Sequence, residues 1–149
     1  MAKGPPKLVA LDHDDSSAEY VGRTEGGQQF FLSRPFVPAV GDEPGREFVA
    51  LYLFDPDGRL TEARIEDMGT RAMMDEGRAK AVRDEILASL GNFSCERIRV
   101  APFRVSRYGV EFGFIPRPPE EPDEDWCVTV EPGDYMCFWP PWTSGDYDT

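Results

Sequence analysis

Histidine, cysteine and long apolar runs are scarce in this 149-residue chain, and each scarcity excludes a class of protein. His13 is the only histidine and it lies near the N-terminus, so Ser-His-Asp and Cys-His catalytic arrangements lack a well-placed base. The three cysteines form no C-x-x-C pair, and no run is apolar and long enough to cross a membrane. The N-terminal residues also lack the apolar region of a signal peptide, so we expect a reduced, cytoplasmic protein.

Sequence motifs for cofactors and metals are also missing. The chain has no G-x-S-x-G, no P-loop and no dinucleotide fingerprint. The acidic run from Asp12 to Asp15 places metal-ligand residue types next to one another on a segment that we expect to be flexible, where adjacent side chains do not converge. Asp55-Pro56-Asp57-Gly58 lacks the distal glutamate of a calcium loop and is typical of a turn. We therefore expect no enzymatic activity, no cofactor and no metal.

Basic residues are scarce toward the C-terminus. The formal net charge is −12; residues 101–149 contain three arginines and ten acids, and no lysine or arginine follows Arg117. Because an acidic chain repels phosphate groups, we expect neither nucleic acid nor an anionic membrane as a partner. A general benefit to solubility explains much of this charge, and a partner with a basic surface is the functional alternative.

The residues that are present organise the chain around one hairpin. Phe48 to Phe54 is apolar at every position, as in a strand buried on both faces. Asp55–Gly58 has the composition of a turn, and residues 61–66 then alternate between small or apolar and charged side chains. This pattern predicts a hairpin whose first strand is central in a sheet.

Three further hairpins and one helix follow from similar patterns. Strands are predicted at residues 20–24 and 28–32, at 98–107 and 110–115, and at 126–130 and 135–139, with a proline-rich loop at 34–45 that lies against the sheet. A helix over about residues 72–90 begins at Thr70 or Asp75, ends before Gly91 and has one apolar stripe, formed by Ala79, Val82, Ile86 and Leu90. We expect an α+β protein in which four successive β-hairpins form antiparallel sheet and the helix packs on one face.

The domain limits follow from composition. Residues 1–18, rich in Gly, Pro and Asp, are expected to form a flexible N-terminal arm in which residues 8–11 could add an edge strand. Residues 19–142 are expected to form one domain, and residues 143–149 a polar tail.

Two strand registers can be predicted. A two-residue turn at Tyr108-Gly109 pairs Val105 with Phe112 and Phe103 with Phe114, which places apolar pairs on one face. In the last hairpin, pairing Val130 with Tyr135 across a four-residue loop places Cys127 and Cys137 on opposite faces, where no disulfide can form; a three-residue loop would place them diagonally on one face.

The C-terminal third contains the candidate binding surface. Five acids crowd into six residues next to several aromatic side chains, and Trp142 and Tyr147 lie beyond the last expected strand. Tryptophan and tyrosine are favoured at interface hot spots, and an acidic rim steers a basic partner. The candidate protein-binding residues are Glu120, Glu121, Asp123, Glu124, Asp125, Trp142 and Tyr147. Aromatic residues also fill sheet interiors, and a core position is the alternative for most of the aromatic residues here, which are Trp126, Tyr135, Phe138, Trp139, Trp142 and Tyr147.

Four segments carry a family resemblance: Val21-Gly22-Arg23-Thr24, Leu53 to Leu60, Ala101-Pro102-Phe103-Arg104-Val105 and Gly113-Phe114-Ile115-Pro116. From about Tyr20 onward the chain resembles small bacterial proteins, many of them planctomycetal, that are labelled formate hydrogenlyase regulatory proteins. The resemblance implies repression of a formate regulon through contact with an activator protein, and it implies no functional residues.

Three functions are therefore open. The first is a non-catalytic regulator that binds a protein with a basic surface. The second is an immunity protein or antitoxin that masks a basic toxin, and the third is a small enzyme with a carboxylate-only site.

Overall fold

The computed structural model describes residues 4–133 and 135–149; residues 1–3 of the expected arm and Asp134 of the last expected turn lie outside the described residues. The protein is α+β, with one helix and antiparallel sheets. In chain order the elements are β1 (Val9–Leu11), β2 (Tyr20–Thr24), β3 (Gln29–Ser33), β4 (Phe36–Val37), β5 (Arg46–Phe54), β6 (Leu60–Thr70), α1 (Glu76–Ser89), β7 (Phe93–Cys95), β8 (Ile98–Val100), β9 (Phe103–Arg107), β10 (Val110–Arg117), β11 (Cys127–Glu131) and β12 (Cys137–Phe138). No helix in the described part of the chain is long and apolar enough to span a membrane.

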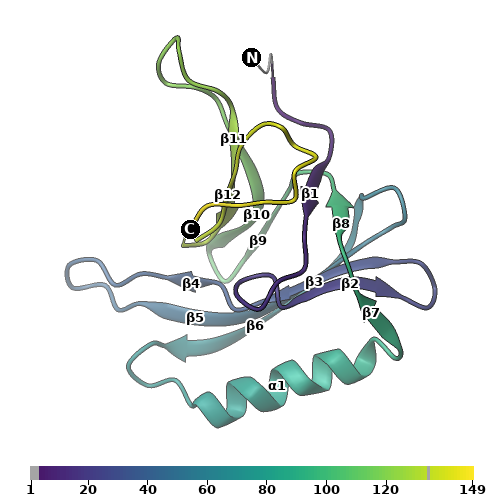
Figure 1. The fold of residues 1–149 in the computed structure, drawn as a ribbon. Coiled ribbons are helices and arrows are strands. Elements are labelled where there is room, and N and C mark those ends of the chain that lie inside the picture. Colours follow the sequence, from purple (N-terminus) through teal and green to yellow (C-terminus); the bar gives the residue numbers. More distant parts are fainter. Residues whose placement is uncertain (1–3, 134) are drawn as a thin grey trace.

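The predicted hairpin, β5 and β6, lies in a six-stranded sheet in which β5 is internal, as expected, and β6 is an edge strand (Figure 1). β5 pairs with β6 along one edge and with β3 and β4 along the other, and β2 and β7 extend the sheet beyond β3. β3 and β4 pair one after the other with the same edge of β5 and in the same register. They are separated at Arg34-Pro35, where proline has no N–H to donate to the ladder. Phe36 and Val37, which the sequence placed in a loop lying against the sheet, instead form strand β4 of the sheet itself.

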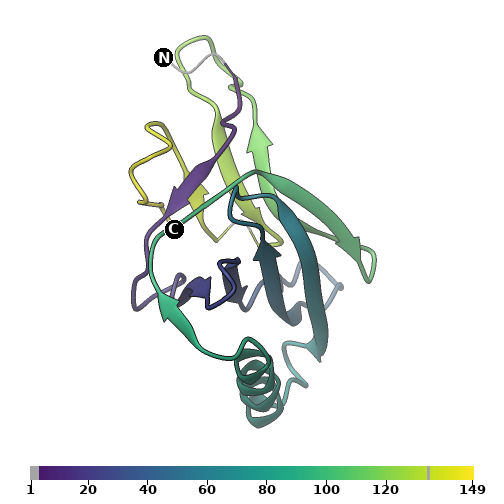
Figure 2. The same ribbon diagram turned by 90° about the vertical axis from the view of Figure 1, so that its right-hand side faces the viewer.

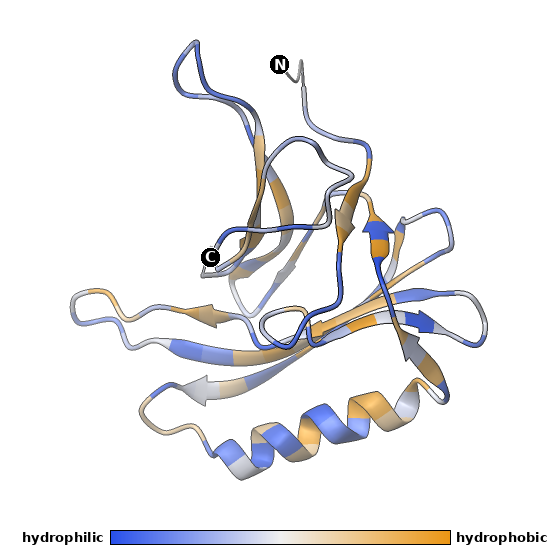
Figure 3. Ribbon diagram, viewed as in Figure 1, coloured by the Kyte–Doolittle hydropathy of each residue, from blue (hydrophilic) through white to orange (hydrophobic). Residues whose placement is uncertain are grey.

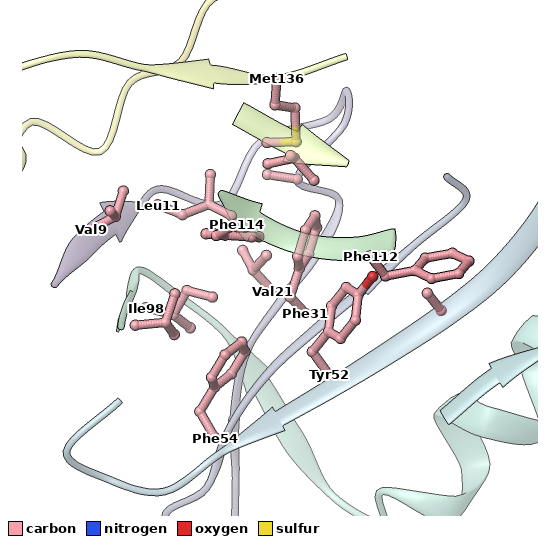
Figure 4. Packing of buried hydrophobic residues seen from close by; sticks show 14 of the residues in the cluster. Val9, Leu11, Val21, Phe31, Tyr52, Phe54, Ile98, Phe112, Phe114 and Met136 are labelled. Atoms are coloured by element: carbon pink, nitrogen blue, oxygen red, sulfur yellow. The ribbon is translucent and has the colours of Figure 1, made fainter. Parts of the chain in front are cut away.

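A four-stranded sheet, in the order β12-β11-β10-β9, covers one face of the six-stranded sheet, and α1 covers the other (Figures 1 and 2). The small β1–β8 ladder lies beside the four-stranded sheet and closes the same core. Most of the buried aromatic side chains fill the space between the sheets, where the rings of Phe114 and Phe31 lie side by side (Figure 4). Phe114 also stacks on Phe103 and Phe138.

Helix α1 has the apolar stripe and the C-terminal end that the sequence predicts, and of the two predicted caps it uses Asp75, so residues 72–75 lie before the helix. Asp75 is the N-cap, and its carboxylate accepts a hydrogen bond from the Arg78 N–H. Gly91 follows the C-cap with φ of 70°, a conformation in which glycine avoids the clash of a Cβ. Ala79 and Ile86 are fully buried against the six-stranded sheet.

The predicted register of the β9–β10 hairpin is confirmed: Val105 pairs with Phe112 and Phe103 with Phe114. Both turn residues have positive φ, 55° at Tyr108 and 72° at Gly109. The Tyr108 ring stacks on Phe48, and its hydroxyl donates to the Ile65 carbonyl at 2.9 Å. These contacts attach the turn to the edge of the six-stranded sheet, which explains a non-glycine residue in the left-handed region.

The single strand predicted at residues 98–107 is wrong, because the chain changes sheet at Ala101-Pro102. β8 pairs with β1, whereas β9 pairs with β10. The proline cannot donate to a ladder, and the Ala101 N–H donates to the Gly58 carbonyl in the turn of the central hairpin.

The segment expected as a flexible arm is instead attached to the domain from residue 9 onward. All three residues of β1 are buried, and Ile98 and Val100 of β8 are buried with them. Asp12 forms an ion pair with Arg97, and the Asp12 N–H donates to the Gly145 carbonyl at 3.0 Å. These contacts also hold residues 143–149, expected as a polar tail, against the domain.

The register predicted for the last hairpin is wrong by one residue. Val128 pairs with Phe138 and Thr129 with Cys137, and the Val130 N–H donates to the Met136 carbonyl at 2.9 Å. Cys127 lies two residues before Thr129, so Cys127 and Cys137 lie diagonally on one face. Both are thiols, as is Cys95.

One core side chain gives a stability prediction. The Tyr52 hydroxyl is buried and has no hydrogen-bond partner among the described residues; in Figure 4 it points toward Phe112. Burying such a group without a partner costs about 1–3 kcal/mol. Tyr52→Phe is therefore expected to raise the free energy of unfolding by about 1 kcal/mol in urea denaturation. Tyr108→Phe is the control, because that hydroxyl is hydrogen-bonded and its loss should lower stability; a loss in Tyr52→Phe would contradict the prediction.

Candidate functional site

The acidic loop, residues 118–126, projects from the four-stranded sheet between β10 and β11 and is strongly hydrophilic (Figures 1 and 3). Glu120, Glu121, Asp123 and Glu124 are exposed, and Asp125 is half-buried. Within the described part of the chain, none of the four exposed carboxylates forms an ion pair with a basic side chain. The expectation that this acid cluster is a surface feature is confirmed for these four residues.

The loop is ordered by hydrogen bonds among its own residues. The Glu120 N–H donates to the Glu124 carboxylate at 3.2 Å, and the Glu124 N–H donates to the Glu121 carbonyl at 3.1 Å. These bonds form a turn at the tip and keep several carboxylates on one small projecting surface. Arg117, the last basic residue of the chain, lies at the base of the loop and donates to Glu131 at 3.2 Å. The Arg117 guanidinium is thus paired with a residue of β11 and does not neutralise the carboxylates of the loop.

Trp142 and Tyr147 were expected to be exposed binding residues, but the structure places them partly inside the domain. Both are half-buried and pack against the main core. The Tyr147 hydroxyl donates to the Asp14 carboxylate and accepts a hydrogen bond from the Ser17 N–H at 3.2 Å. These contacts hold the segment after β1, so the structure gives both side chains a role in packing.

Trp139 is the exposed aromatic residue of this region, with 43% of its surface accessible. It follows β12, in which Phe138 is buried, so the alternation of the strand turns Trp139 outward. A hollow of about 190 Å³ lies beside it, lined also by Cys137, Asp146, Tyr147 and Asp148. Sequence reasoning missed Trp139 because residues 135–139 are apolar or aromatic at every position and reveal no outward face.

The residue types that resemble metal ligands have other roles. Asp55 accepts hydrogen bonds from the N–H groups of Asp57 at 2.9 Å and Arg59 at 3.0 Å, which confirms the predicted turn. Asp12 binds Arg97, and Asp14 accepts from Tyr147. Among the described residues, no three His, Cys, Asp or Glu side chains are grouped so that they could hold a metal ion.

Neutralising the acidic loop gives the second stability prediction. The loop-neutral variant replaces Glu120, Glu121 and Glu124 with Gln and Asp123 with Asn. Because these carboxylates repel one another and make no ion pair with a described base, the melting temperature is expected to stay the same or to rise. Thermal unfolding followed by circular dichroism checks this. A fall in melting temperature would mean that the loop stabilises the fold, and would count against a binding role.

Comparison with models of known protein families, with curated proteins and with solved structures found no match to this chain.

Proposed function

We propose that this protein is a non-catalytic binding protein whose acidic loop and Trp139 together dock a protein with a basic surface. The observation that carries the proposal is the group of four exposed carboxylates on one projecting loop, without an ion pair to a described base. The regulatory role implied by the resemblance to formate hydrogenlyase regulatory proteins is part of this proposal.

The electrostatic part of the argument concerns association. Four carboxylates on a projecting loop produce a negative potential that is strongest where a partner first approaches. Such a potential raises the rate of encounter with a basic surface and disfavours acidic partners. Because the carboxylates are solvated before binding, forming ion pairs there requires no internal ion pair to be broken first.

The aromatic part concerns the lifetime of the complex. Trp139 lines the same hollow as the exposed residues Asp146 and Asp148. A guanidinium or ammonium group is attracted both to an indole face and to carboxylates. The hollow therefore suits an arginine or lysine side chain of the partner, with the acidic loop steering the encounter.

The test is capture of partners by immobilised full-length protein. We compare wild type, the loop-neutral variant and a control variant that neutralises four exposed acids of other loops and strands, Asp42→Asn, Glu43→Gln, Asp57→Asn and Glu62→Gln. A partner with a basic surface should be recovered by wild type and by the control variant at low salt, and lost by the loop-neutral variant. Equal recovery by all three would refute the proposal. A captured toxin would assign the protein to the immunity class, and a captured activator to the regulatory class.

A further inference from the structure

A second hollow, of about 450 Å³, lies on a different part of the molecule from the acidic loop. It forms where the open end of the β2–β3 hairpin meets α1, the segment after β1 and the residues before β12. We propose that this hollow binds a small organic anion, a carboxylate or a phosphate monoester carried on a planar apolar body. The inference is independent of the protein-binding proposal.

Two guanidinium groups at the hollow carry the first step. Its lining includes Arg34, Arg83 and one carboxylate, Glu19, and each arginine is also paired with a carboxylate outside the lining, Glu76 or Asp84. The two guanidinium groups come from separate elements, the β3–β4 connection and α1. Guanidinium groups present planar pairs of donors that match carboxylate and phosphate oxygens.

Both arginines are held in place before any ligand arrives. Arg34 donates to both oxygens of Glu76, one at 2.9 Å, and Arg83 forms an ion pair with Asp84 at 3.1 Å. The Arg83 guanidinium also lies over the Tyr20 ring, 5.7 Å from its centroid. Each guanidinium has five N–H donors, so these contacts leave donors for a ligand. Holding the arginines in advance lowers the entropy cost of binding.

Hydroxyl groups add neutral donors. The Tyr135 hydroxyl donates to the Ser33 hydroxyl oxygen at 3.0 Å, which leaves the Ser33 hydrogen available to a bound molecule. Burial raises the pKa of Tyr135, and burial together with Glu19 raises the pKa of Tyr20, so both phenols stay protonated near neutral pH. Ser16 and Ser17 line the same hollow.

The remaining lining defines the body of the ligand. Leu32, Phe36, Tyr20 and Tyr135 provide apolar or aromatic surface, and the Phe36 and Tyr135 rings lie 6.2 Å apart. A volume of about 450 Å³ is in the range of small-molecule sites. An anionic head facing the arginines and a planar body against these rings would use both parts of the lining.

The test is an NMR titration of the full chain with benzoate, phenyl phosphate, benzamide and inorganic phosphate. Benzoate or phenyl phosphate is expected to shift the backbone amides of Ser16, Ser17, Ser33 and Arg34 in a saturable way. Benzamide, which keeps the ring and lacks the charge, should bind at least about tenfold more weakly. The tighter of the two anions identifies the head group as a carboxylate or a phosphate. Inorganic phosphate binding as tightly as phenyl phosphate would refute the role of the apolar body.

Variants then locate the anion. Arg83→Gln and Arg34→Gln should each weaken binding by about tenfold. Arg64→Gln is the matched control, because Arg64 also pairs with a glutamate of α1, Glu85, but does not line this hollow. Arg64→Gln should leave the affinity within about twofold of wild type. The inference fails if neither anion shifts these amides saturably, or if all three variants bind equally well.

Discussion

Gly113→Ala is expected to lower the free energy of unfolding by about 3 kcal/mol or more, because it combines backbone strain with a clash in the four-stranded sheet. Gly113 lies in β10 between Arg104 of β9 and Glu131 of β11, with φ of 149°. A Cβ built at this position would lie 2.0 Å from the Phe103 carbonyl oxygen. That neighbour is backbone of a paired strand, so the clash cannot be relieved by a rotamer change. Urea denaturation measures the loss.

Gly91→Ala is the matched control for this prediction. Gly91 also has a positive φ, 70°, but a Cβ there meets no atom within 4 Å. Its cost should be that of the left-handed conformation alone, about 1 kcal/mol. Equal losses in the two variants would show that the close approach of β9 and β10 at Gly113 is not the cause.

Trp139→Ala is expected to speed dissociation of the basic partner by about thirtyfold, the equivalent of about 2 kcal/mol for an interface hot spot. Its effect on stability should be small, because the side chain is among the exposed apolar residues. Surface plasmon resonance with the partner recovered in the capture experiment measures the dissociation rate.

Trp142→Ala is the comparison that separates binding from folding. This side chain packs against the main core, so its removal should lower the free energy of unfolding by about 2 kcal/mol or more. The folded variant should release the partner at the wild-type rate. If Trp142→Ala speeds dissociation and Trp139→Ala does not, the aromatic anchor is the residue that the sequence suggested and our assignment of Trp139 is wrong.

The parts of the fold that the sequence predicted depend on local patterns. The central hairpin follows from the apolar run of β5 and a turn of standard composition, and helix α1 from its cap, its stripe and Gly91. The β9–β10 register follows from the pairing of apolar residues across a two-residue turn. In each case the residues that decide the structure lie close together in the chain.

The parts that could not be predicted depend on distant partners. β1 is buried by β8, and Asp12 is held by Arg97, so a segment with the composition of a solvated arm is part of the core. β8 separates from β9 because its pairing partner is the N-terminal strand. The apolar run at residues 8–11 indicated an edge strand, which β1 confirms, but no local pattern in residues 1–18 indicates that β8 is its partner or that Arg97 holds Asp12.

The candidate site was likewise predicted only where local sequence decides the structure: the acidic loop was predicted, and its aromatic neighbour was not. Four acids of one loop are exposed as their composition suggests, because a dense run of charge is hard to bury. Which aromatic side chain is exposed near these acids depends on the direction in which each residue of β12 points. A register error of one residue exchanges the buried and the exposed side chains. The hollow between Arg34 and Arg83 has no sequence signal, because its lining comes from four separate segments.

The most direct test of the binding account is the association rate of the captured partner, measured from low to high salt. Wild type should associate quickly at low salt and slow steeply as salt rises, because the acidic loop steers the encounter. The loop-neutral variant should associate about ten- to a hundredfold more slowly at low salt, with a flatter salt dependence, while the control variant with Asp42, Glu43, Asp57 and Glu62 neutralised follows wild type. Equal rates and slopes for wild type and the loop-neutral variant, or equal losses in both variants, would contradict docking through the acidic loop.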